Sequence, residues 1–61
     1  MIRDANILLS YINTKLRDEY ASLEELAEDL NLEQAEIELI LNGAGYFYNA
    51  KINQFTTEER L

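Results

Sequence analysis

The 61-residue sequence predicts one mainly α-helical domain (residues 1–61), with a three-helix, helix-turn-helix-like core and a short C-terminal β-hairpin, as in a winged helix. Two patterns predict this class. Apolar residues recur at helical spacing through the first two thirds of the chain, and the last third changes to short segments rich in aromatic residues. With 48% hydrophobic residues and no proline, the chain is expected to fold, although its core must be small.

The first helix is expected over residues 4–20, with Asp4 as its N-cap. Six residues at helical spacing form its core stripe: Ala5, Leu8, Leu9, Ile12, Leu16 and Tyr20. Ile7 and Tyr11 are four residues apart and point nearly opposite to that stripe. Two alternatives stay open for this pair, because the hairpin could cover it or it could form an exposed docking surface.

The second helix is expected over residues 22–30 and begins at a capping box. The Ser22 hydroxyl is expected to accept a hydrogen bond from the third backbone N–H, and Glu25 to accept one from the N–H of Ser22 itself. Asn31 follows the helix, and asparagine tolerates the left-handed backbone of a tight turn better than most residues.

The third helix is expected over residues 33–42, with Gly43 as its C-terminal stop. Its core residues are Ile37, Ile40 and Leu41. A hairpin is expected over residues 46–55, and residues 56–61 are expected to form a frayed tail. The hairpin register stays open, since neither arm alternates over enough residues to set it.

The charge distribution argues against nucleic acid as a partner. The net charge is −7, and residues 21–45 contain seven acids and no base. This acidic face consists of Glu24, Glu25, Glu28, Asp29, Glu33, Glu36 and Glu38. It would repel phosphate, so DNA binding is disfavoured. The simplest interpretation is a solvated face that keeps the protein soluble, and the alternatives are a DNA mimic or a dock for a basic protein.

Several site types lack the residues that they need. The chain has no cysteine and no histidine, which excludes disulfides, thiolate zinc sites and histidine proton transfer. No nucleophile–base pair is visible, so we expect no enzyme, no metal and no cofactor. The longest apolar run, residues 7–9, is far shorter than a membrane span, and no signal-peptide pattern is present. A cytoplasmic protein is therefore expected.

The third helix carries the most specific functional signal. Ala35 and Leu39 lie opposite its core stripe, and Asn42 continues this strip by one turn. We expect a protein-interaction or self-association module, in which a two-fold dimer places Leu39 against its symmetry mate. A single exposed leucine without a function is the simpler alternative. A nucleic-acid-binding regulator using Lys15, Arg17 and Lys51 is the rival from another class.

Four segments together resemble a family of very small bacterial proteins labelled domain of unknown function 4250. They are residues 6–10, residues 12–18 with the string N-T-K-L-R-D, residues 22–26, and the closing segments from Gly45-Tyr46 to Asn53-Gln54-Phe55. The resemblance supports the fold and implies no activity. It directs attention to the polar end of the first helix, with Asn13, Lys15, Arg17 and Asp18. There, Asn13 or Arg17 is expected to satisfy backbone groups of a nearby segment, and a small polar docking patch is the alternative.

Overall fold

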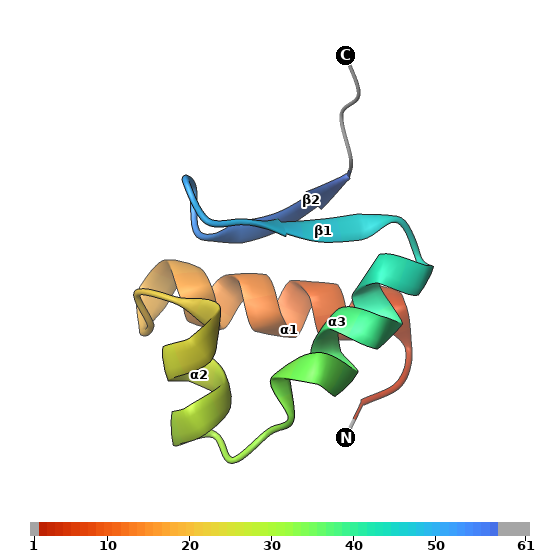
Figure 1. Ribbon diagram of the computed structural model, residues 1–61. Helices are drawn as coiled ribbons and strands as arrows, with labels where there is room; N and C mark the ends of the chain where they lie inside the picture. Colours follow the sequence, from red (N-terminus) through yellow and green to blue (C-terminus); the bar gives the residue numbers. More distant parts are fainter. Residues whose placement is uncertain (1, 58–61) are drawn as a thin grey trace.

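The computed structural model describes residues 2–57 and has three helices followed by one antiparallel hairpin (Figure 1). The elements are α1 (Ala5–Asp18), α2 (Leu23–Asp29), α3 (Gln34–Gly43), β1 (Tyr46–Asn49) and β2 (Gln54–Thr57). This order confirms the predicted fold class. The hairpin lies along α1, while α2 lies near the C-terminal end of α1 and α3 crosses near its N-terminal half.

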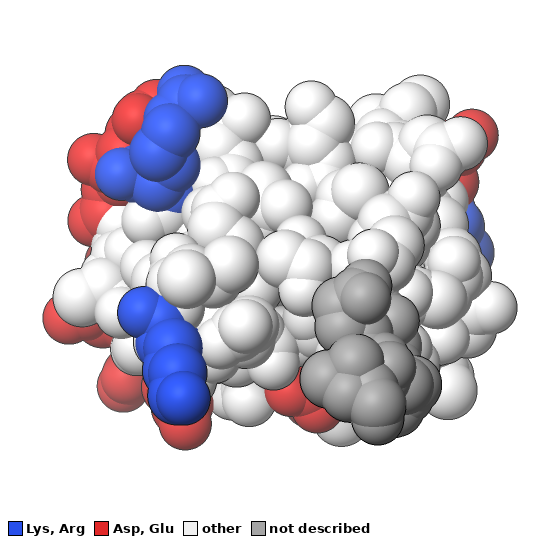
Figure 2. All heavy atoms as spheres, turned by 90° about the horizontal axis from the view of Figure 1, so that it is seen from above, with Lys and Arg blue, Asp and Glu red and all other residues white. Residues whose placement is uncertain are grey.

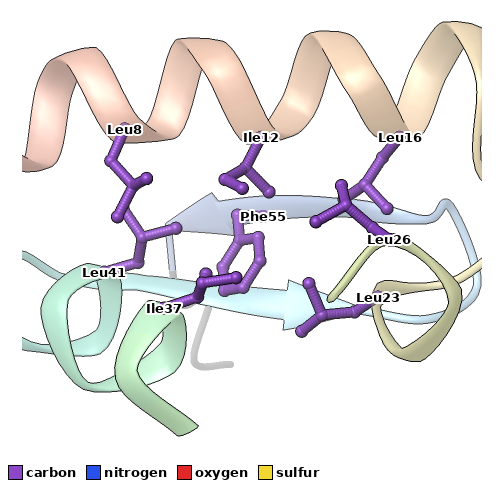
Figure 3. Close-up of a cluster of buried hydrophobic side chains, with 8 residues drawn as sticks. All are labelled: Leu8, Ile12, Leu16, Leu23, Leu26, Ile37, Leu41 and Phe55. Carbon is purple, nitrogen blue, oxygen red and sulfur yellow. The ribbon is translucent and has the colours of Figure 1, made fainter. Parts of the chain in front are cut away.

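The core is one apolar cluster to which every helix and β2 contribute. Its buried members are Leu8, Ile12, Leu16, Leu23, Leu26, Ile37, Leu41 and Phe55. The three α1 residues come from the predicted stripe, and the Phe55 ring lies in the middle of the cluster (Figure 3). Phe55 is only 2% exposed and also contacts Tyr48, with ring centroids 5.5 Å apart. The hairpin is therefore part of the core that the helices need.

The two predicted helix starts are confirmed. The Asp4 carboxylate accepts hydrogen bonds from the N–H groups of Asn6 at 2.9 Å and Ile7 at 3.2 Å. The Ser22 hydroxyl accepts the N–H of Glu25 at 3.1 Å. The Glu25 carboxylate accepts the N–H of Ala21 at 2.9 Å, one residue before the predicted partner. Asp4 thus satisfies two of the N–H groups that an isolated helix leaves without partners, and Ser22 satisfies one.

The predicted C-terminal end of the first helix is wrong by two residues, since α1 ends at Asp18 and not at Tyr20. In a continuing helix the Tyr20 N–H would bond the carbonyl of Leu16. It bonds the carbonyl of Lys15 instead, at 3.1 Å. The Leu16 carbonyl accepts from the Asn53 side chain at 3.1 Å. A contact from the hairpin therefore terminates this helix.

The turns around α3 confirm one prediction and correct another. Asn31 has a φ of 58°, as expected for a left-handed turn residue. Gly43, the expected stop, is the last residue of α3, and the glycine with positive φ is Gly45, at 94°. The last turn tightens because the N–H groups of Ala44 and Gly45 bond carbonyls three residues earlier, at 3.1 and 3.0 Å. The left-handed residue then redirects the chain into β1.

The hairpin extends further along the sequence than predicted. Its pairs are Tyr46–Thr57, Phe47–Thr56, Tyr48–Phe55 and Asn49–Gln54. Thr56 and Thr57 are paired strand residues, which corrects the expected frayed tail; residues 58–61 of that tail lie outside the described residues. Ile52 lies in the turn between the two strands and is 56% exposed. Asn53, with a φ of 56°, closes this turn.

Candidate functional site

The outer face of α3 presents the predicted strip of Ala35, Leu39 and Asn42, which we call the α3 strip. All three residues are exposed, and Leu39 is 73% exposed. Ile37 and Leu41 on the opposite face of the same helix are fully buried. The helix thus buries the apolar face that carries Ile37 and Leu41 and leaves Leu39, on the opposite face, exposed to water. A partner protein that covered Leu39 would remove this apolar surface from water.

Ile7 and Tyr11 are exposed, by 56% and 39%, and the alternative in which the hairpin covers them is wrong. The hairpin contacts α1 through Asn13, which lies on a different side of this helix. Tyr11 instead lines a shallow apolar hollow of about 200 Å³ together with Ile2, Leu8 and Leu32. The Lys15 ammonium nitrogen lies 5.8 Å from the centre of the Tyr11 ring, at the upper end of cation–π contact distances.

Four of the seven residues of the acidic face are engaged within the fold. The engaged pairs are Ala21–Glu25, Tyr20–Asp29, Gln34–Glu38 and Arg3–Glu36. The side chains of Glu24, Glu28 and Glu33 are exposed and have no hydrogen-bond or ion-pair partner within residues 2–57. Within residues 2–57 the only ion pair of this face joins Arg3 and Glu36, so the other six carboxylates keep an uncompensated negative charge.

The contact between Tyr20 and Asp29 raises the pKa of the Tyr20 hydroxyl. The Tyr20 hydroxyl donates a hydrogen bond of 2.5 Å to the Asp29 carboxylate. This hydrogen bond, aided by desolvation and by the negative charge of Asp29, raises the pKa of Tyr20 to about 12. The contact joins the end of the first helical segment to α2 and keeps Tyr20 neutral far into alkaline conditions.

Within residues 2–57 the basic side chains do not gather into the patch that the rival nucleic-acid function needs. Lys15 pairs with Glu19 at 2.9 Å, and Arg17 pairs with Asp18 at 2.8 Å. These hydrogen bonds raise the pKa of Lys15 and of Arg17 and lower that of Asp18. On the face shown in Figure 2 the basic side chains lie apart, at its rim, with an uncharged surface between them. The charges of Lys15 and Arg17 are thus each neutralised by an adjacent carboxylate.

The feature that the residue patterns described least well is an amide clamp between α1 and the hairpin. The Asn13 side chain accepts the N–H of Phe55 at 2.8 Å and donates to the carbonyl of the same residue at 3.0 Å. Asn53 donates to the carbonyls of Leu16, at 3.1 Å, and Tyr20, at 2.9 Å. Asn13, Asn53 and their main-chain partners are the amide clamp.

Two further contacts complete this region. Gln54 donates to the carbonyl of Asn13 at 2.9 Å, and the Tyr48 hydroxyl donates to the Asn53 side chain at 2.6 Å. The expectation that Asn13 or Arg17 satisfies the backbone of a nearby segment is confirmed by Asn13, whereas Arg17 pairs with Asp18. The string N-T-K-L-R-D drew attention to Asn13, but the sequence did not reveal its hydrogen-bond partner, Phe55, which lies 42 residues away.

Chemistry within the described residues is limited. No group of three or more acids in residues 2–57 is placed to hold a metal ion. Every helix of this part of the chain also falls short of the length and apolar character of a bilayer-spanning helix. The surface features that the fold leaves available are the α3 strip, the acidic face and the hairpin.

These features define the protein class as a three-helix domain completed by a C-terminal β-hairpin. The chain belongs to the family described as domain of unknown function (DUF4250), whose profile matches residues 2–55. This range includes the whole amide clamp and ends at Phe55, its last member. Searches of curated proteins and of solved structures gave no match, so the comparison with winged helices stays a prediction.

Proposed function

We propose that this chain is a protein-interaction module that docks a basic amphipathic helix of another protein on the α3 strip. The observation that carries the proposal is the 73% exposure of Leu39 in the middle of a helix whose opposite face is fully buried. Burying the remainder of a leucine side chain contributes about 1–2 kcal/mol, close to a tenfold change in affinity. The small Ala35 beside it lets a partner backbone approach closely.

The surrounding charge favours a basic partner over a second copy at this site. Glu36 and Glu38 lie on either side of the strip, and the segment 21–45 contains no base. Glu36 already pairs with Arg3 at 3.0 Å, whereas Glu38 accepts only from the neutral Gln34 amide within residues 2–57 and keeps its charge for a partner. A two-fold dimer through Leu39 would bring two such acidic surfaces together and would tighten as salt rises. A basic helix would place lysines against the flanking carboxylates, as charged residues lie at the rim of an interface, and would bind more weakly as salt rises.

The test uses a synthetic amphipathic helical peptide with leucines at positions i and i+4 and lysines on both sides of them. Titration into the isotope-labelled protein should shift the amide resonances of α3, with an affinity that falls between low and physiological salt. Leu39→Glu should weaken binding about tenfold. Because this change adds a negative charge, any electrostatic effect on a basic peptide would act in the opposite direction.

The matched control is Ile7→Glu, the same type of substitution at an exposed apolar residue of α1. It should leave the peptide affinity unchanged, and circular dichroism should show both variants folded. Absence of binding to the native protein, or equal loss in the two variants, would reject the α3 strip as the docking surface. Binding that tightens with salt would reject the basic partner.

A further inference from the structure

The two edges of the hairpin differ in their main-chain hydrogen bonding. At the outer edge of β2, both the N–H and the carbonyl of Phe55 bond the side chain of Asn13. These groups therefore point away from β1, and Tyr48–Phe55 is a non-hydrogen-bonded pair of the antiparallel ladder. The side chain of Asn13 thus takes the place of a neighbouring strand at Phe55 and blocks this edge there.

The outer edge of β1 is open. Since Tyr48 faces Phe55 across a non-hydrogen-bonded pair, its N–H and carbonyl point away from β2, and the same holds for Tyr46 two residues earlier. Neither residue has a main-chain hydrogen-bond partner at this edge within residues 2–57. The preceding turn leaves room, because a Cβ added at Gly45 or Gly43 would meet no atom within 4 Å. Such an edge is a template for another strand.

We propose that β1 pairs with β1 of a second copy of this chain, antiparallel, about a two-fold axis that passes beside Phe47. In this register Tyr46 of each copy pairs with Tyr48 of the other, and the four open main-chain groups of each strand all gain partners. Phe47 faces its symmetry mate in a non-hydrogen-bonded pair, where side chains approach most closely. The 38% exposed ring of Phe47 would be covered by this contact.

Charge supports a second copy as the occupant. Residues 46–49 carry no charge, and the middle of the hairpin side of the molecule is uncharged in Figure 2. In the proposed register, Lys51 in the turn of one copy lies toward the C-terminal end of α3 of the other. That helix end has no basic residue in its last turn and carries a partial negative charge. Two β1 strands that pair in this register therefore bring no like charges together at the two-fold axis. At each end of the paired strands, Lys51 of one copy lies near the partial negative charge of α3 of the other.

The closed edge of β2 explains why the assembly stops at two chains. The dimer would have one four-stranded sheet with the order β2–β1–β1–β2. Both outer edges are the edges that Asn13 occupies. An isologous two-fold contact whose outer edges are blocked at Phe55 in this way is a closed dimer and not a filament. The surface used here is separate from the α3 strip, so the two proposals succeed or fail independently.

The first test is sedimentation over a range of concentrations with three matched variants. Phe47→Lys puts like charges directly opposite one another at the axis and should raise the dimer Kd at least about tenfold. Ile52→Lys makes the same change at another exposed apolar residue of the hairpin and should leave Kd within about twofold. Leu39→Glu should also leave it unchanged. A monomer at every concentration, or a dimer that only Leu39→Glu dissociates, would overturn the proposal.

A second test reports the contact between the two β1 strands by covalent coupling. The chain has no cysteine, so a single introduced cysteine reports one contact. Residue 47 is the position of β1 that faces itself across the axis, at a Cα separation compatible with a disulfide. Under mild oxidation Phe47→Cys should form a covalent dimer much faster than Ile52→Cys or Leu39→Cys. Equal rates in the three variants, or faster coupling at position 39, would contradict the β1 pairing.

Discussion

Removal of the Asn13 side chain should destabilise the domain more than any other polar substitution on α1. Asn13→Ala deletes one hydrogen bond to the N–H and one to the carbonyl of Phe55, at 2.8 and 3.0 Å. Each contributes about 0.5–1.5 kcal/mol net, and the partly buried groups left without partners add to the loss. We expect a total of about 2–3 kcal/mol, or 10–20 °C in Tm, in a domain whose whole stability is expected to be about 3–5 kcal/mol.

The assay is urea denaturation followed by far-ultraviolet circular dichroism, in which this loss corresponds to a midpoint shift of about 2 M. Asn6→Ala is the matched control, because Asn6 is an exposed α1 residue whose side chain has no hydrogen-bond partner within residues 2–57. Both substitutions replace an asparagine of α1 by alanine, so their difference chiefly measures the contact with β2. A loss within about 0.5 kcal/mol of the control would refute the argument that Asn13 holds the hairpin on the helices.

Two further predictions concern the other end of this contact region. Asn53→Ala should destabilise the fold by about 1 kcal/mol more than Asn53→Gly. Both variants lose the hydrogen bonds to α1, but only alanine is strained at a φ of 56°. A lower urea midpoint for Asn53→Gly than for Asn53→Ala would contradict this. Asp29→Asn should lower the Tyr20 pKa from about 12 toward its ordinary value of 10, which alkaline titration of tyrosinate absorbance measures. Since the folded state holds the Tyr20 proton more tightly than the unfolded state, native stability should fall as the pH rises from 10 toward 12. The Asp29→Asn variant should lack most of this pH dependence. Identical alkaline titrations of the two proteins would show that the hydrogen bond has no effect.

The two proposed surfaces differ in the force that would hold a partner. The α3 strip combines one exposed leucine with flanking carboxylates, so its binding should depend on salt and on the charge of the partner. The β1 edge is uncharged and offers main-chain groups, so its pairing should depend little on salt and strongly on the geometry of the strand. Measuring both at two salt concentrations therefore separates them without any substitution.

Local features of the sequence were sufficient to predict the helices. Asp4 and Ser22 cap helices through hydrogen bonds to residues at most three positions away, and Asn31 adopts its left-handed turn on its own. The spacing of Leu8 and Ile12 likewise identified the buried face of α1. The spacing of Leu39 identified an exposed one. Such features depend on contacts within one or two helical turns, which residue spacing encodes directly.

The tertiary structure decided how the hairpin is paired and where it attaches. The register, the exposed turn position of Ile52 and the end of α1 all depend on contacts between residues 33 to 42 positions apart, made by Asn13 and Asn53. An asparagine can cap, turn or bond a distant backbone, and the sequence alone does not distinguish these roles. Only the docking of β2 against α1 places the Phe55 main chain within reach of Asn13. The same docking leaves β1 as the open edge.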